Sequence, residues 1–235
     1  MHKYWKKNRR QLQMTITHLN RFHNRSLRKT TKLSDVPLDN IFSKLSLVLW
    51  TSLAEVELNI LITENEHFTR AFLDTVDLTK KIETQKWLAL LDYYFQKHYL
   101  TSRKRTLSKT NLGDTAHHRY HAIREFILDD LEPFIELRNR VAHGQWAVAF
   151  NSDGLKKNQE MTTHIWKLSK KDLIFLKSLV KNLPPLVKLL ITSKTTFERD
   201  YDKYLNRINR AREGVDLRFN FLVKHLKRKA KNKKA

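Results

Sequence analysis

The stretch Ile41–Ile62 reads IFSKLSLVLWTSLAEVELNILI, and it decides the fold class. Its apolar residues, among them Leu45 and Leu49, recur close to the 3.6-residue period of an α-helix. Because most of its circumference is apolar, we expect a central helix that other helices surround. Lys44 and Glu55 interrupt the apolar run, which falls short of the about 20 apolar residues that a membrane-spanning helix needs.

Helical periods flank this stretch on both sides, and four Gly and four Pro residues are too few for a turn-rich β protein. The flanking segments with a helical period are Phe68–Leu78, Lys80–Tyr99, Thr115–Asp130, Glu132–His143, a helix opened by the capping box Ser169-x-x-Asp172, and a long helix that includes Phe197–Ile208. The apolar pattern changes to alternation after Gly144, so we expect a β-hairpin at about 145–168, with Thr162–Leu168 as its returning strand. The sequence therefore predicts an all-α helical bundle with one small hairpin.

Proline and glycine suggest where these helices bend or end. Pro133 is expected to kink or restart its helix, and Pro184-Pro185 to interrupt another. Gly144 is placed to cap the helix that ends near His143, because glycine adopts a positive φ at little cost.

The net charge of +22 is concentrated at the two ends of the chain. Residues 1–33 and 203–235 each carry +10, whereas the residues between them are almost neutral. We therefore expect a basic N-terminal extension at 1–33, a helical domain at 34–212 and a basic C-terminal tail at 213–235, the last dozen residues being mobile.

Charge of this size favours a polyanionic partner, and RNA is the one we expect. The candidate nucleic-acid contacts are Arg103, Lys104 and Arg105 in a polar loop and Lys227, Arg228 and Lys229 near the C-terminus. Two other readings stay open: a solvated tail that aids solubility, and an interfacial helix at Arg218–Lys229, where apolar residues recur among cations.

Several kinds of chemistry have no counterpart in this sequence. The absence of cysteine excludes disulfides, Cys-based zinc sites and cysteine catalysis, and neither a glycine-rich phosphate loop nor HExxH occurs. His117 and His121 lie one helical turn apart, with Glu125 one turn further, but no additional ligand is evident. We expect no metal and no cofactor, and a cytoplasmic protein, since no targeting segment is visible.

The most unusual stretch is Arg138-Asn139-Arg140-Val141-Ala142-His143, at the end of a predicted helix. An arginine can hold a phosphate through its fork of donors, and a histidine can exchange a proton near neutral pH. An asparagine can orient either group by hydrogen bonding. These are the functions needed to cleave RNA without a metal.

This stretch resembles the motif of the HEPN superfamily, an arginine and a polar residue followed by a histidine, and the resemblance covers about residues 39–146. It implies a helical bundle with a metal-independent endoribonuclease site, in which Arg138 binds phosphate, Asn139 orients and His143 is the acid/base. It further implies a homodimer with a composite active site, attack by the ribose 2′-hydroxyl, and a role in antiphage defence or as a toxin with an antitoxin partner.

Other residues are weaker candidates for the same site. An acid on an early helix often faces the motif in this superfamily, so Glu55 and Glu57 are supporting candidates, although either could instead face solvent or pair with an arginine. Arg140 lies outside the family pattern but shares a helix face with His143.

Helix geometry leaves the pairing of Arg138 with His143 open. Five residues apart, they lie roughly 140° apart around a straight helix. Arg138 could reach around, the helix could loosen toward Gly144, or a partner subunit could supply the second half of the site. A purely structural reading is a helix C-terminus stabilised by cations, with Glu136 pairing with Arg140.

Two functions of other classes compete with the ribonuclease. One is a non-catalytic nucleic-acid-binding protein, in which the basic ends bind and the motif is structural. The other is an interaction subunit of a defence or toxin–antitoxin complex.

Overall fold

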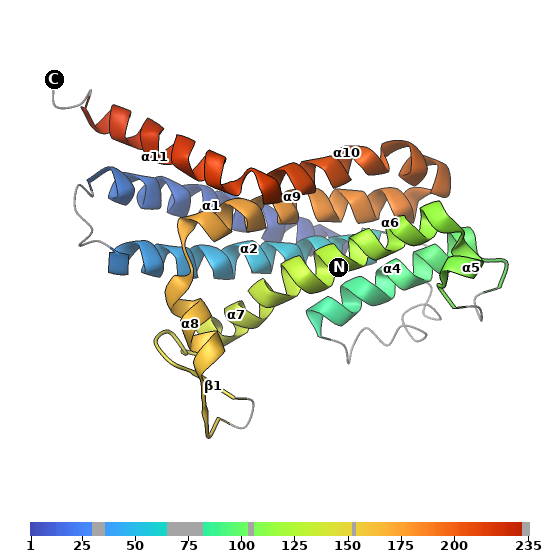
Figure 1. Ribbon diagram of the computed structural model, residues 1–235, viewed down its shortest axis with the longest axis horizontal. Coiled ribbons are helices and arrows are strands. Elements are labelled where there is room, and N and C mark those ends of the chain that lie inside the picture. The colour runs from blue at the N-terminus through green and yellow to red at the C-terminus, as the bar shows by residue number, and fades with distance from the viewer. Residues whose placement is uncertain (30–35, 65–81, 103–105, 152–153, 232–235) are drawn as a thin grey trace.

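Helix α2 (Val36–Glu64) is the long apolar helix that the sequence predicts, and it lies inside a bundle of helices (Figure 1). The computed structural model describes residues 1–29, 36–64, 82–102, 106–151 and 154–231. α2 packs against α1 (His2–Lys29), α7 (Glu132–Ala142) and α9 (Lys170–Thr192). By length and composition α2 could cross a bilayer, but 56% of its most apolar 18-residue window is buried in the bundle, as in a core helix.

The remaining elements complete the bundle and add one two-stranded sheet. They are α4 (Glu83–Tyr99), α5 (Lys109–Leu112), α6 (Asp114–Glu125), the π-helical segment η2 (Phe126–Leu131), β1 (Ala149–Phe150), β2 (Lys157–Asn158), α8 (Gln159–Lys167), α10 (Lys194–Glu213) and α11 (Val215–Lys231). Within the described ranges, the predicted all-α class with a small hairpin is confirmed. The helix expected at Phe68–Leu78 lies outside them.

Aromatic side chains of α4 and α10 fill part of the core. Trp87, Phe95 and Phe197 are fully buried, and the rings of Phe95 and Phe197 meet edge to face with their centroids 5.7 Å apart. Burial of each such side chain stabilises the fold by about 1.5–3 kcal/mol. This packing fixes the position of α4, whose first residue is Glu83.

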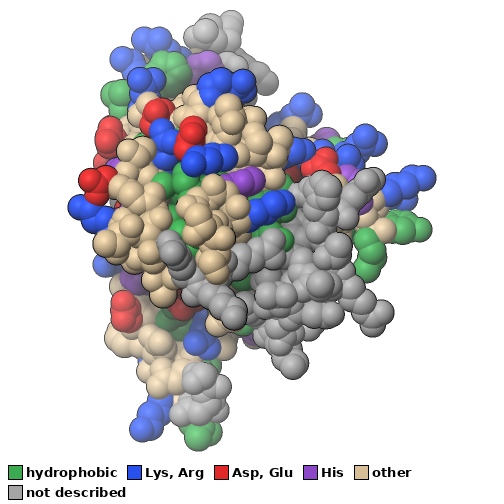
Figure 2. Space-filling model, turned by 90° about the vertical axis from the view of Figure 1, so that its right-hand side faces the viewer, with side chains coloured by type: hydrophobic (Ala, Val, Ile, Leu, Met, Phe, Trp, Pro, Cys, Tyr) green, Lys and Arg blue, Asp and Glu red, His purple; other side chains and the backbone are tan. Residues whose placement is uncertain are grey.

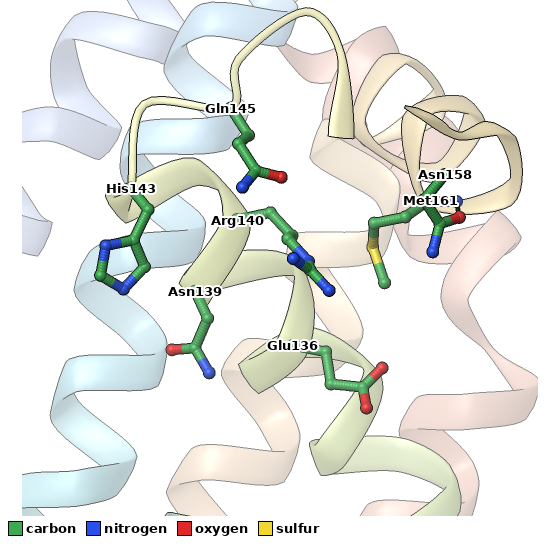
Figure 3. Close-up of a pocket in the computed structure, with 7 residues that line it drawn as sticks. All are labelled: Glu136, Asn139, Arg140, His143, Gln145, Asn158 and Met161. Carbon is green, nitrogen blue, oxygen red and sulfur yellow. Dashed lines mark hydrogen bonds between the residues drawn. The ribbon is translucent and has the colours of Figure 1, made fainter. Parts of the chain in front are cut away.

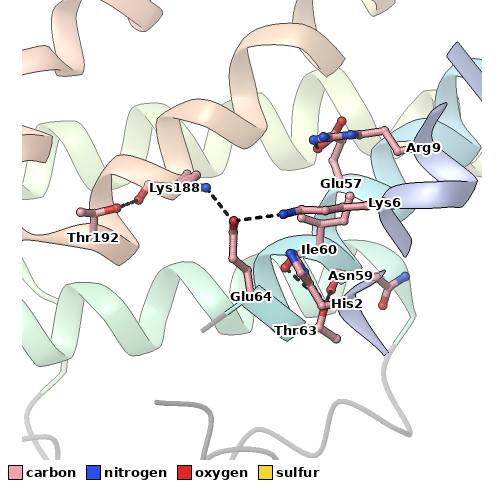
Figure 4. A network of polar contacts seen from close by, with 10 residues as sticks. All are labelled: His2, Lys6, Arg9, Glu57, Asn59, Ile60, Thr63, Glu64, Lys188 and Thr192. Atoms are coloured by element: carbon pink, nitrogen blue, oxygen red, sulfur yellow. Dashed lines mark hydrogen bonds and ion pairs between the residues drawn. The ribbon is translucent and has the colours of Figure 1, made fainter. Parts of the chain in front are cut away.

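Most of residues 1–33, expected as a basic extension, form α1, which lies along α2. Ile16 on α1 is buried in the core. Figure 4 shows polar contacts between the two helices, including Arg9 of α1 at 3.5 Å from Glu57 of α2. The described part of the N-terminal segment is therefore an integral helix of the bundle.

A buried polar network joins α1 to α2 and α9. Lys170 Nζ donates to Asn20 Oδ1 at 2.7 Å and lies 3.4 Å from His23 Nδ1. The second ring nitrogen of His23 lies 2.5 Å from Asp39. Burial lowers the pKa of Lys170 to about 8, and the nearby Asp39 carboxylate opposes that shift. A side chain from each of three helices thus meets in one network, which fixes their relative positions.

The C-terminal segment is also part of the bundle. The last dozen residues were expected to be mobile. Of these, 224–231 belong to α11, which packs against α9 and α1, and 232–235 lie outside the described residues. Its apolar residue Leu226 is buried, with 3% of its surface exposed. The apolar spacing in Arg218–Lys229 therefore serves docking on the body, at least through Leu226.

One continuous helical rod leads to the motif through α6, η2 and α7 (Figure 1). Tyr120 and Arg124 hold the α6 part of the rod against α4, since both donate to Asp92, at 2.7 and 3.3 Å. Pro133 has no N–H to donate and its ring crowds the preceding turn, and the π-helical turn immediately before it accommodates both effects. The predicted irregularity at Pro133 is thus a π-helical segment.

The predicted glycine cap of α7 is confirmed. Gly144 has φ +81° and its N–H donates to the Val141 carbonyl, while the Gln145 N–H donates to the Arg140 carbonyl at 2.9 Å. This pair of hydrogen bonds is the Schellman arrangement. It turns the chain sharply, so that the segment after the motif leads into the hairpin.

The hairpin is smaller than predicted, and its expected returning strand is a helix. β1 and β2 pair antiparallel, with Ala149 opposite Asn158, and Thr162–Leu168 lies almost wholly within α8. The Asn158 side chain accepts a hydrogen bond from the Met161 N–H and so caps α8. Thr162 and Ile165 are the buried residues of α8, which is a helical spacing and not an alternating one.

Side chains of α2 anchor this hairpin and α8. Asn40 Nδ2 donates to the Ile165 carbonyl at 3.1 Å and to the Leu168 carbonyl at 3.3 Å. Lys44 Nζ donates to the Trp146 carbonyl at 2.7 Å. The hairpin is therefore held against α2, next to the end of α7.

The prediction that Pro184-Pro185 interrupts a helix is wrong. α9 runs from Lys170 to Thr192 through both prolines, and Pro184 is buried in the core. Packing against neighbouring helices offsets the hydrogen bonds that the prolines cannot make. The capping box at the start of α9 is confirmed, with the Ser169 N–H donating to Asp172 at 2.9 Å.

Candidate functional site

Helix α7 presents two different sides at the motif. Ile135, Leu137 and Val141 face the core, whereas Asn139 and His143 are exposed. The packed side fixes the helix, and the Schellman turn at Gly144 places His143 at the accessible end of α7. The histidine is thus held on a rigid element and remains open to a ligand.

A pocket of about 420 Å³ lies between the end of α7 and the hairpin with α8 (Figure 3). We call it the hairpin pocket, and the residues that line it are Glu136, Asn139, Arg140, His143, Gln145, Asn158 and Met161. In Figure 3 the Arg140, Asn158 and Met161 side chains converge on one side of α7, with Glu136 below them and with Asn139 and His143 on the adjacent side. Three residues of the predicted stretch thus share one pocket.

Arg138 lines a different pocket, of about 260 Å³, between α7, α2 and the start of α4. Its guanidinium donates to Glu83 at 2.7 Å, and Glu55 lies 3.8 Å away. Arg138 is 19% exposed at its side chain and Glu83 is 7% exposed. We call Glu83 and Glu55 the acidic clamp on Arg138.

Glu83 is the buried acid of this clamp. Burial raises its pKa to about 7, the Arg138 guanidinium opposes that rise, and the Glu55 carboxylate adds to it. Glu83 Oε1 and Arg138 Nε are buried without a hydrogen-bond partner among the described residues. The pair is therefore only partly satisfied, and a proton can be gained or lost there near neutral pH.

The structure does not bring Arg138 and His143 into one pocket within a chain. They face different sides of α7, as their spacing of five residues implies. Asn139 and Glu136 border both pockets and separate them. Arg140 is the cation that shares the hairpin pocket with His143, and among the described residues no ion pair joins it to Glu136.

Glu55 and Glu57, the two predicted acids, point to different sides of α2 because they are two residues apart on the helix. Glu55 is near the motif, whereas Glu57 faces α1 and lies 3.5 Å from Arg9 (Figure 4). Burial raises the pKa of Glu57, and Arg9 opposes that rise. Two positions differ by about 200° around a helix, so both could not have faced α7. Glu57 thus pairs with an arginine, one of the two alternatives left open for it, and lies on α2 away from the motif.

Sequence reasoning missed Glu83, the acid in closest contact with the motif. It lies 55 residues before Arg138 and beyond the residues left undescribed after α2. Its only local signal is an acid in the first turn of a helix, which is common because it suits the helix dipole.

The other candidate residues are placed as follows. The rings of His117 and His121 lie 4.3 Å apart on α6, but no group of three potential metal-ligating side chains occurs among the described residues. Arg103, Lys104 and Arg105 lie outside the described residues, as do the side chains of Lys227 and Lys229. Arg228 is exposed on α11.

No protein-family model, curated protein or solved structure matches this chain.

Proposed function

We propose that this protein is a metal-independent endoribonuclease. The observation that carries the proposal is the exposed His143 at the fixed end of α7, in a pocket that it shares with Asn139 and Arg140. The pocket holds a proton-exchanging group, an amide and a guanidinium on one rigid element. These are the groups that cleavage by the ribose 2′-hydroxyl requires.

The reaction proceeds as an internal displacement at phosphorus. Neutral His143 takes the proton of the 2′-hydroxyl, and the 2′-oxygen forms a bond to phosphorus as the bond to the 5′-oxygen breaks. The leaving 5′-oxygen takes a proton from a protonated imidazole or from water, and the product carries a 2′,3′-cyclic phosphate. Arg140 stabilises the charge that develops on the phosphoryl oxygens.

Arg138 has a different position in this proposal. The acidic clamp holds it on the far side of Asn139 from His143. An RNA strand that crosses the exposed side of α7 passes both cations, and Arg138 binds its phosphate by exchanging Glu83 for it. In a homodimer, Arg138 of one chain can serve His143 of the other, as the HEPN resemblance implies.

The exposed side of α7 supports the dimer. Asn139, Ala142 and His143 are exposed there in the part of the chain that the structure describes, although they lie next to well-packed elements of the bundle. We propose that two α7 helices meet through these residues and form one composite site. A role in antiphage defence or as a toxin, with an antitoxin or defence-complex partner, is part of the same proposal and rests on the resemblance alone.

The test is cleavage of labelled RNA by the purified protein in EDTA, with the product ends analysed. We expect 2′,3′-cyclic ends from the wild-type protein and none from His143→Ala. His118→Ala is the matched control, because His118 is an exposed histidine on α6. Equal cleavage by the wild-type protein and His143→Ala would remove His143 from the proposal.

A second function, nucleic-acid binding without cleavage, is favoured by one observation. α1 and α11 contact each other, so basic residues from both ends of the sequence lie on one pair of neighbouring helices. Its exposed cations include Arg21, Arg25, Arg218, Lys224 and Arg228. Figure 2 views the molecule from the right-hand side of Figure 1, and Lys and Arg side chains are spread over that side as well. RNA binding that weakens steeply with salt, without any cleavage, would favour this second function.

A further inference from the structure

We propose that the hairpin pocket binds a guanine base of the RNA, next to the phosphate that is cleaved. This inference rests on the proposed function and deepens it, because it assigns a base preference to the same site. The pocket is built from two parts of the chain, the end of α7 and the hairpin with α8. Its volume of about 420 Å³ falls within the range of about 300–1,000 Å³ usual for small-molecule sites.

The hairpin fixes the direction of two amide side chains in this pocket. Gln145 Oε1 accepts a hydrogen bond from the Phe150 N–H at 3.0 Å, and Asn158 Oδ1 accepts one from the Met161 N–H at 2.9 Å. A backbone N–H can only donate, so the oxygen of each amide is the atom engaged. The NH2 groups of Gln145 and Asn158 have no partner among the described residues and remain as donors at the pocket.

Helix α7 adds one cation and one acid to these donors. Arg140 and Glu136 lie one turn apart, both line the pocket, and no ion pair joins them in the described structure. Two opposite charges that share a pocket without pairing are each free to bind a ligand. The pocket therefore offers a fork of donors beside a pair of acceptor oxygens.

Guanine matches this arrangement. Its O6 and N7 are neighbouring acceptors, and two of the five N–H donors of a guanidinium bind both at once, which is the commonest specific contact of arginine with a base. Arg140 then keeps three donors for the phosphoryl oxygens. Its N1–H and N2–H groups are neighbouring donors that fit the Glu136 carboxylate. Adenine places an amino group where guanine has O6, so it would meet the Arg140 guanidinium donor to donor.

Met161 can pack against the flat face of an unstacked base. Its side chain reaches toward Arg140 in Figure 3, and a polarisable thioether packs well against an aromatic ring. RNA-binding proteins recognise splayed-out bases in this way, by stacking and by hydrogen bonds to the base edge. Because His143 and Asn139 line the same pocket, a base bound here lies beside the proposed reaction centre.

The test is a comparison of GMP and AMP binding to the full-length protein by isothermal titration calorimetry. We expect the dissociation constant of GMP to be about tenfold lower than that of AMP, because only guanine pairs its base edge correctly with the pocket. Glu136→Gln should reduce this preference about tenfold, since an amide cannot accept both guanine donors. Glu160→Gln, which removes an exposed carboxylate from α8 outside the pocket, should leave the preference unchanged.

Mononucleotides have no bond for this enzyme to cleave, so the binding test is independent of the proposed function. GMP preference without RNA cleavage would support the base site and refute the ribonuclease. Equal binding of GMP and AMP, or equal preferences in Glu136→Gln and Glu160→Gln, would overturn the base site even if RNA is cleaved.

Discussion

The acidic clamp on Arg138 should make the stability of this protein fall with rising pH, and Glu83→Gln should remove most of that fall. Burial raises the pKa of Glu83 to about 7, against an ordinary value of 4.5. Between these two values the native protein holds a proton that the unfolded chain has released. The stabilisation from Glu83 is therefore complete below pH 4.5 and is lost as pH rises through 7.

The size of the effect follows from the same two values. Their difference, at 1.36 kcal/mol for each pKa unit, corresponds to about 3 kcal/mol. The Glu83 side chain is only 7% exposed, so solvent screening reduces this figure little. An effect of this size is a large part of the about 5–15 kcal/mol that usually separates native and unfolded states.

Urea unfolding at several pH values between 5 and 8 measures this effect. We expect the wild-type unfolding free energy to fall across this range more steeply than that of Glu83→Gln. Glu160→Gln is the matched control, because Glu160 is an exposed carboxylate on α8 outside the acidic clamp. If Glu83→Gln and the wild-type protein give parallel curves, Glu83 is not the group that titrates.

Replacing Arg138 tests the same clamp from the other side. The guanidinium opposes the rise in the pKa of Glu83, so Arg138→Met should move that pKa above 7. The loss of stability should then extend to higher pH than in the wild-type protein. A curve shifted to lower pH would show that Arg138 does not act on Glu83 as the geometry indicates.

Three further predictions concern other parts of the fold. The Lys170 pKa of about 8 lies below the ordinary 10.5, so the unfolding free energy should rise by up to about 3 kcal/mol between pH 8 and 10.5. Urea unfolding of Lys170→Met should show little of this rise. An equal rise in Lys170→Met and the wild-type protein would contradict the assignment to Lys170. Gly144→Ala places a Cβ at φ +81° and should destabilise the protein by about 1 kcal/mol, with strain as the only cause because nothing lies within 4 Å of that Cβ; an unchanged unfolding midpoint would argue against strain there. Leu226→Ala should cost about 2 kcal/mol if α11 is docked as described, whereas a mobile tail would give no change on thermal unfolding.

Local sequence rules predicted the elements whose stability is local. The period of α2, the capping box at Ser169 and the glycine cap at Gly144 each depend on residues a few positions apart. The same rules failed where tertiary packing decides. Thr162–Leu168 alternates enough to resemble a strand, but Asn40 of α2 binds the carbonyls at the end of α8 and holds it as a helix.

The candidate site shows the same limit. The position of His143 at the end of a helix followed from the sequence, and so did its shared face with Arg140. The partner of Arg138 did not, because Glu83 reaches it only through the packing of α4. The concentration of charge at the two ends was read correctly from composition, but composition does not show that α1 and α11 pack onto the body and touch each other.

The π-helical segment η2 determines which way the side chains of the motif, Arg138–His143, point around the axis of α7. Such a turn contains one residue more than the α-helix would, and one residue corresponds to about 100° of rotation. α6 upstream is aligned to Asp92 of α4, whereas α7 downstream is aligned to α2 and α8. Removing a single residue from η2 would leave α6 and α7 intact but rotate every motif side chain by about 100° around the helix axis. Arg138 would leave its clamp and His143 its pocket, so the register of one turn governs the geometry of the entire site.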